Sequence, residues 1–133
     1  MTAVRSNPLR IVIAADAAVC GLSGLGLALD AGLVAGPLGM PAAVLQPLGE
    51  GLIAYAVILA WLASRPSLPR VVVWTLVALN VAWAVESVMA PMIGWAQPTG
   101  VGLALLLVQA AGALLVADLQ FLALRRARRE AAA

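Results

Sequence analysis

Four long stretches of the chain consist almost entirely of apolar residues. They run over residues 11–29, 48–63, 71–90 and 99–124. A helix rises about 1.5 Å per residue, so about 20 apolar residues cross a hydrocarbon core of about 30 Å. The pattern therefore predicts an all-α protein in which four transmembrane helices form a bundle, with residues 1–133 as a single integral membrane domain.

The breaks between these stretches carry turn chemistry. They contain Gly36-Pro37, Pro66, Pro91 and Pro98. Proline lacks a backbone N–H and restricts the residue before it, so we expect helix boundaries at these positions. The first loop, 30–47, is itself apolar, and we expect it either to lie along the membrane interface or to re-enter the bilayer.

The arginines are segregated along the chain. All eight lie in segments 1–10, 65–70 and 125–133, whereas loops 30–47 and 91–98 contain none. Because positive residues favour the cytoplasmic side, the pattern predicts a multi-pass protein of the bacterial inner (cytoplasmic) membrane with both termini in the cytoplasm. An odd number of spans would place the two arginine-rich tails on opposite sides.

Two further features bear on this topology. Trp61 and Trp74 each lie four residues from an arginine of the second loop and Trp95 lies in the opposite loop, as in an aromatic belt at the two interfaces. A cleaved signal peptide would also begin with arginines. Its apolar run is typically about 7–15 residues long, however, whereas the first stretch here is longer and contains Asp16.

Composition narrows the function classes. The chain is 64% apolar and 11% charged, with no histidine and one cysteine, Cys20, which excludes an ordinary soluble domain. Ser-His-Asp and Cys-His catalysis lack their base, and histidine-based haem and zinc sites lack their ligands. We therefore expect no enzyme, no metal site and no cofactor. The net charge of +2 is explained by arginines that orient the chain in the membrane rather than by binding of nucleic acid.

Carboxyl groups inside the apolar stretches are the first candidates for function, because each costs about 2.5–3.5 kcal/mol at the centre of a membrane helix. Counted from the arginines, Asp16 and Asp118 lie about 9–10 Å into the membrane, and we expect each to reach water or an arginine such as Arg10, Arg70 or Arg125.

A second tier lies about 22–24 Å from the arginines and comprises Glu50, Glu86 and Gln109. If their helices meet, the two glutamates would form a coupled acid pair that binds a proton or a cation, or a purely structural hydrogen bond. Glu50 is also close to a helix start, where it could cap backbone N–H groups instead.

A polar stripe marks the third stretch. Asn80, Trp83 and Ser87 lie within about 60° of one another on a helical face, and Glu86 is about 60° beyond Trp83. We expect this face to point into the bundle. Together with Tyr55 it could line a pocket for a small lipophilic or cationic ligand, with Trp83 as a cation–π surface. The alternative is that Asn80 bonds a neighbouring helix.

Small residues recur on the first stretch. Asp16, Cys20, Gly24 and Ala28 are spaced by four, which is typical of closely packed membrane helices. This face could serve the bundle itself or a second copy of the chain, and Cys20 is interpreted as a small core residue. The C-terminal arginines either set the orientation or bind anionic lipid headgroups.

The segment Asn80-Val81-Ala82-Trp83-Ala84-Val85-Glu86-Ser87, the Pro98-Thr99-Gly100 start of the last stretch, and Leu119-Gln120 shortly before Arg125-Arg126 resemble the small, uncharacterised four-helix inner-membrane proteins of bacteria. In size and span number the chain is also similar to small multidrug-resistance transporters. In that family a first-helix glutamate is the coupling acid, and Asp16 is its nearest counterpart here, but the residues around Asp16 do not match the family's motif and the long first loop departs from it, so the transport function is not carried over.

These observations favour a non-enzymatic membrane protein that acts by helix–helix association with itself, with a membrane-protein partner or with the lipid bilayer. Association into homo-oligomers is among these expectations, and binding of nucleic acid is not expected. Two alternatives remain at this point. One is a proton- or cation-coupled small transporter that uses its intramembrane carboxyls, and the other is a binder of a lipophilic ligand.

Overall fold

Four long helices dominate the computed structural model, which describes residues 3–94 and 96–133. All four are long and apolar enough to cross a membrane, which confirms the four predicted spans. A short helix and a two-stranded sheet complete the fold. The elements are β1 (Ala3–Val4), α1 (Asn7–Leu29), α2 (Ala31–Leu38), α3 (Ala42–Ala63), β2 (Leu68–Pro69), α4 (Arg70–Met92) and α5 (Gly100–Ala132).

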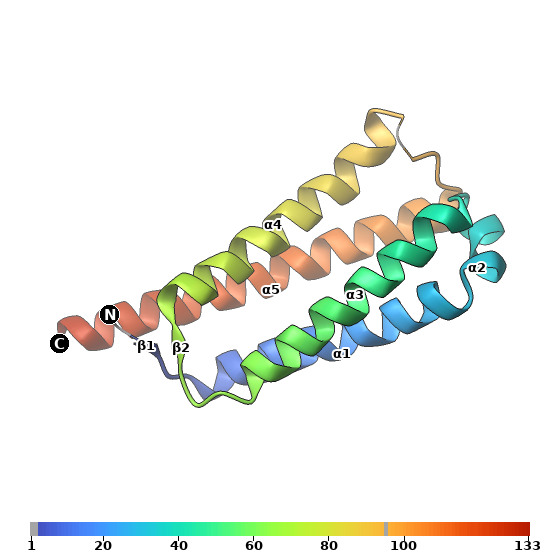
Figure 1. The fold of residues 1–133 in the computed structure, drawn as a ribbon. Coiled ribbons are helices and arrows are strands. Elements are labelled where there is room, and N and C mark those ends of the chain that lie inside the picture. The colour runs from blue at the N-terminus through green and yellow to red at the C-terminus, as the bar shows by residue number, and fades with distance from the viewer. Residues whose placement is uncertain (1–2, 95) are drawn as a thin grey trace.

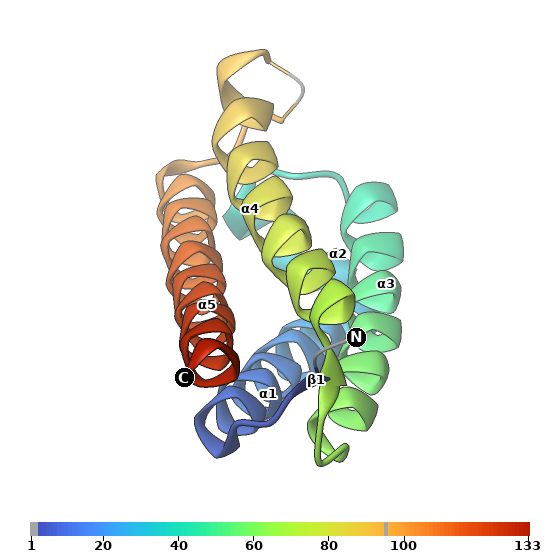
Figure 2. The ribbon, with the colours of Figure 1, turned by 90° about the vertical axis from the view of Figure 1, so that its left-hand side faces the viewer.

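The long helices form two antiparallel hairpins (Figure 1). α1 packs along α3, and α4 packs along α5, whereas α3 and α4 scarcely touch each other. Viewed from the end that carries both chain termini, the α1–α3 pair and the α4–α5 pair lie side by side as two layers (Figure 2). The arginine-bearing ends of the helices lie at this same end (Figure 1).

Local sequence explains where the outermost helices begin. The Ser6 hydroxyl accepts the backbone N–H of Leu9 at 3.2 Å, which caps the start of α1, and Pro8 stands in the first turn, where a missing N–H costs little. The Thr99 hydroxyl caps α5 in the same way by accepting the N–H of Gly102 at 3.2 Å. Gly39 ends α2 with φ of +68°, a left-handed conformation that favours glycine.

Several boundaries differ from the sequence-based expectation, and Pro37 and Pro91, expected at helix boundaries, lie inside α2 and α4. The first loop is largely helical, because it contains α2 and the first turns of α3, which begins at Ala42 rather than at residue 48. Pro47 lies inside α3 instead of ending the loop. The C-terminal arginines are the continuation of α5 to Ala132 and not a separate tail. Alanine and arginine are both strong helix formers, which explains this extension.

The best-buried core lies at the arginine-rich end. There β1 pairs antiparallel with β2, with Ala3 opposite Pro69 and Val4 opposite Leu68, so the N-terminal segment is held against the loop between α3 and α4. The cluster consists of buried apolar residues from four helices and the sheet: Val4, Leu9, Ile13, Ala17, Leu59, Leu62, Leu68, Val73, Leu76 and Leu124. It joins the two hairpins at this end.

Close backbone contact holds α1 against α3. A Cβ added at Gly24 would lie 2.7 Å from the carbonyl oxygen of Gly49, and one added at Gly49 would lie 2.7 Å from the carbonyl oxygen of Gly24. The small-residue face of α1 is therefore used inside the bundle, one of the two roles left open by its sequence. The backbones approach closely because neither position carries a side chain.

Aromatic residues accompany the arginines, as a membrane interface requires. The Arg65 guanidinium lies 4.3 Å from the centre of the Trp61 ring, and Trp74 packs edge-on against Phe121 with ring centres 5.7 Å apart. Trp95, expected in the belt at the opposite interface, lies outside the described residues.

Candidate functional site

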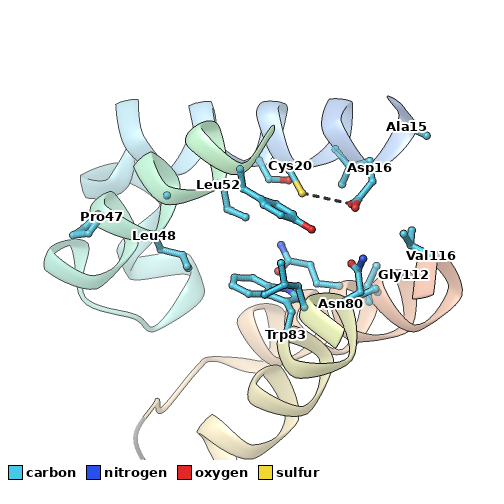
Figure 3. A pocket seen from close by; sticks show the side chains of 18 residues that line it. Ala15, Asp16, Cys20, Pro47, Leu48, Leu52, Asn80, Trp83, Gly112 and Val116 are labelled. Atoms are coloured by element: carbon cyan, nitrogen blue, oxygen red, sulfur yellow. Dashed lines mark hydrogen bonds between the residues drawn. The ribbon is translucent and has the colours of Figure 1, made fainter. Parts of the chain in front are cut away.

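A cavity of about 620 Å³ lies between the two hairpins (Figure 3). It is bounded by the buried core at the arginine-rich end. All four long helices contribute to its wall, which is mostly apolar. The lining residues are Ala15, Asp16, Val19, Cys20, Ser23, Pro47, Leu48, Gly51, Leu52, Tyr55, Leu79, Asn80, Trp83, Val108, Gln109, Gly112, Ala113 and Val116.

The cavity is elongated along the helices. Its wall on α1 runs from Ala15 to Ser23, and eight residue steps of helix correspond to about 12 Å. Asp16 and Val116 lie at one end and Pro47 and Leu48 at the other (Figure 3). The Asp16 end is the one nearer the arginines. The carboxyl group thus stands at one end of a largely apolar slot.

Among the described residues that line the cavity, Asp16 is the only Asp, Glu, Lys or Arg. The Cys20 thiol, one turn along α1, donates to Asp16 Oδ1 at 3.5 Å (Figure 3). The other oxygen, Oδ2, is buried and has no hydrogen-bond partner among the described residues, and the same holds for the Tyr55 hydroxyl. Buried polar atoms without partners are costly, so these two atoms would gain most from a ligand that supplies a donor.

Asn80 of α4 faces Asp16 from the opposite hairpin (Figure 3). It is buried, and its side-chain N–H₂ donates to the Leu76 carbonyl at 3.0 Å and to Gln120 Oε1 at 3.4 Å. The bond to Gln120 joins α4 to α5, as the sequence alternative for Asn80 proposed. The same residue thus both links two helices and lines the cavity.

Trp83 lies one turn from Asn80 and contributes an aromatic wall to the same cavity (Figure 3). Ser87, the third member of the stripe, is buried and donates to the Trp83 carbonyl at 2.8 Å, so its hydroxyl is satisfied within α4. Gln109 of α5 also lines the cavity. The structure therefore brings Tyr55, Asn80, Trp83 and Gln109 together around Asp16.

The predicted grouping of Glu50 with Glu86 is not what the structure shows. Both side chains are exposed on the bundle surface and neither belongs to the cavity wall. Glu50 accepts from the Gln46 amide at 3.4 Å, within α3. The two glutamates belong to different hairpins whose facing helices scarcely touch. Equal depth along the helices does not bring side chains together, because it leaves their rotation about the helix axes open.

Asp16 and Asp118, the two acids expected nearer the arginines, also lie in different environments. Asp16 lines the cavity, whereas Asp118 is exposed on α5 between the buried residues Ala117 and Gln120. The expected arginine partner Arg10 instead donates its Nε–H to the Ala63 carbonyl at 2.9 Å, across from α1 to the end of α3. Asp16 is thus bonded to the Cys20 thiol rather than held by a salt bridge to Arg10.

Ser23 of the cavity wall and Gln120, which bonds the wall residue Asn80, were not among the candidate site residues of the sequence. Ser23 lies seven residues after Asp16, on the same face of α1, and this spacing was a usable signal. Gln120 is completely buried and bonds Asn80, and its Nε2 has no partner among the described residues. A lone glutamine in an apolar run was visible, but nothing in the chain paired it with Asn80 forty residues earlier.

The residues that the structure describes contain no group of three or more His, Cys, Asp or Glu side chains able to hold a metal ion. Comparisons of the chain with models of protein families, with curated proteins and with solved structures found no match. The site is therefore interpreted from its own geometry.

Proposed function

We propose that this chain is a non-enzymatic inner-membrane protein that binds one lipophilic molecule with a cationic or N–H-donating head, such as a long-chain amine, in the cavity between its hairpins. The observation that carries the proposal is the combination in one apolar slot of a carboxyl oxygen and a tyrosine hydroxyl, both buried and without partners. The arginine segregation supports cytoplasmic termini, which would place Asp16 in the inner half of the bilayer.

Size and polarity agree with a small ligand. Ligand cavities typically measure about 300–1,000 Å³ and are mostly apolar with a few placed polar groups, and this one is about 620 Å³. A head group at Asp16 would leave about 10 Å of slot for an apolar body reaching toward Pro47. The face of Trp83 would add a cation–π contact to a cationic ligand.

The other functions considered from the sequence have less support. The small-residue face of α1 is occupied by α3, so it is not free for a second copy at Gly24. A transporter based on coupling between Glu50 and Glu86 would need the two carboxyls together, and they lie exposed on different hairpins.

The proposal is tested by equilibrium binding of decylamine and of its neutral counterpart decanol to the protein in nanodiscs. Trp83 is the reporter after Trp61, Trp74 and Trp95 are replaced by Phe, and affinities are compared at equal mole fraction of each probe in the bilayer. We expect decylamine to bind saturably and Asp16→Asn to weaken it about 10-fold or more, because hydrogen bonds to charged groups contribute about 1.5–3 kcal/mol. Decanol affinity should change little.

Glu86→Gln is the matched control, since it likewise removes one carboxyl from a long apolar helix, but outside the cavity wall. It should leave decylamine binding unchanged. Equal affinity for the two probes, or equal effects of Asp16→Asn and Glu86→Gln, would refute the proposal.

A further inference from the structure

A second feature of the molecule is an aromatic pair on the α4–α5 hairpin, outside the cavity wall. Trp74 of α4 and Phe121 of α5 pack edge-on, with ring centres 5.7 Å apart and ring planes inclined by 64°. Neither residue lines the cavity. Trp74 is 46% exposed, so its ring is accessible from the bilayer.

The aromatic contact fixes the register of the two helices. Arg70 lies four residues before Trp74 in α4, and Arg125 lies four residues after Phe121 in α5. Because the helices are antiparallel neighbours (Figure 1), each arginine lies one turn, about 6 Å, beyond the aromatic pair in the same direction. Residues four apart share a helix face. Arg70 and Arg125 thus lie at the same level of the α4–α5 hairpin, about one helical turn from the Trp74–Phe121 pair.

Arg125 is already oriented over this pair. Its guanidinium carbon lies 5.9 Å from the centre of the Phe121 ring, within the range of a cation–π contact. The side chain is exposed, so its N–H groups can reach a ligand at the surface. Stacking on a ring that is itself packed against Trp74 limits the rotamers of Arg125 and reduces the entropy lost on binding.

The corresponding place on the other hairpin is different. There the Arg65 guanidinium lies over Trp61, but the neighbouring arginine of α1, Arg10, donates to the Ala63 carbonyl. Its Nε–H is therefore committed to the backbone. The nearest acid on α5, Glu130, is five residues from Arg125, about 7.5 Å along the axis and about 140° around the helix. Arg70 and Arg125 thus bring two positive charges to one level of the α4–α5 hairpin, and an anion bound there would reduce their repulsion.

We propose that Arg70 and Arg125, above the Trp74–Phe121 pair, form a binding site for the phosphate of one anionic phospholipid, whose glycerol and upper acyl region lies against the two rings. Guanidinium groups bind phosphate through paired N–H donors, and tryptophan favours the interfacial depth at which the glycerol lies. The site is separate from the cavity and does not depend on the proposed cavity ligand.

The test uses the full-length chain with Trp74 as the single tryptophan, after Phe replaces Trp61, Trp83 and Trp95. The protein is reconstituted in phosphatidylcholine bilayers that contain the same mole fraction of either brominated phosphatidylglycerol or brominated phosphatidylcholine, and quenching of Trp74 gives the relative association constant. We expect a preference for phosphatidylglycerol. Because each arginine near the surface contributes about 1 kcal/mol to anionic lipid binding, Arg70→Gln or Arg125→Gln should reduce it about fivefold.

Arg126→Gln is the matched control, because it removes the same charge from the next residue, about 100° around α5. It should reduce the preference by less than twofold. Phe121→Leu keeps every charge but removes the ring under Arg125, and should also lower the preference. It provides a second test if the arginine variants fold poorly.

No preference for phosphatidylglycerol in the parent protein would overturn the proposal. So would equal losses in Arg126→Gln and Arg125→Gln, which would indicate diffuse attraction by the whole basic end. Inorganic phosphate in the aqueous phase should leave the preference in place. Its abolition by phosphate would show a site for a free anion and would contradict the assignment to lipid.

Discussion

Gly24 lies where the backbones of α1 and α3 are in close contact, and we expect Gly24→Ala to destabilise the bundle. The added Cβ would lie 2.7 Å from the Gly49 carbonyl oxygen and 2.9 Å from both Cγ1 and the backbone N of Ile53, whereas ordinary contact begins at 3.4 Å. The obstacle is largely backbone, so the helices must separate by about 0.7 Å at this point. Overpacking of this kind typically costs about 1–3 kcal/mol.

Gly26→Ala is the matched control for this substitution. Gly26 lies in the same helix, and a Cβ added there meets nothing within 4 Å. Both substitutions gain the same helix propensity, up to about 1 kcal/mol, so the difference between them isolates the clash.

The assay is reversible unfolding in mixed micelles, followed by circular dichroism. We expect the free energy of unfolding of Gly24→Ala to be about 1–3 kcal/mol lower than that of Gly26→Ala. Equal stabilities, or a more stable Gly24→Ala, would refute the close approach of α1 and α3.

Three further predictions concern the ends and interior of the bundle. Thr99→Val should lower the free energy of unfolding by about 1–2 kcal/mol in the same assay, because the Thr99 hydroxyl caps α5 and also donates to the Pro37 carbonyl. Thr99→Ser keeps the hydroxyl and should not lower it, and equal effects of the two substitutions would contradict this role. Gln120→Leu should lower the free energy of unfolding by less than about 1 kcal/mol, because it loses only the long 3.4 Å bond to Asn80 and removes an amide nitrogen that has no partner among the described residues. A larger loss would show that the Asn80–Gln120 bond is a main link between α4 and α5. In a Cys20→Ser background, a cysteine at Ala133 should be protected from an impermeant thiol reagent in intact cells and one at Gly94 should be labelled, and the reverse pattern would contradict cytoplasmic termini.

The number of spans and the segregation of charge could be read from the sequence because both depend on position along the chain. The distance of a residue along its helix from the arginines follows from counting, and this gives Asp16 and Asp118 similar expected depths. Rotation about the helix axis and the choice of neighbouring helix do not follow from counting. Asp16 therefore lines the cavity while Asp118 is exposed, and Glu50 and Glu86 lie apart.

The residues of the cavity wall show the same contrast between what a single helix reveals and what depends on its neighbours. The face formed by Asn80, Trp83 and Ser87 was readable because it lies on one helix, and the structure places Asn80 and Ser87 in buried positions. That Tyr55 and Asp16 would complete a cavity with this face depends on which helices form hairpins, and no pattern within one helix reports that. Helix likewise occupies most of loop 30–47, as α2 and the first turns of α3, and residues 125–132, where proline and arginine had indicated boundaries.

Photolabelling tests the proposed cavity site most directly. The protein in nanodiscs is irradiated with a long-chain primary amine that carries a diazirine at its apolar end, and the labelled peptides are identified by mass spectrometry. We predict labelling of cavity-wall positions such as Leu48 and Leu52, reduced by excess decylamine and by Asp16→Asn. Labelling confined to bundle-surface residues such as Leu29 and Leu115, unaffected by the competitor, would contradict an intramembrane ligand site.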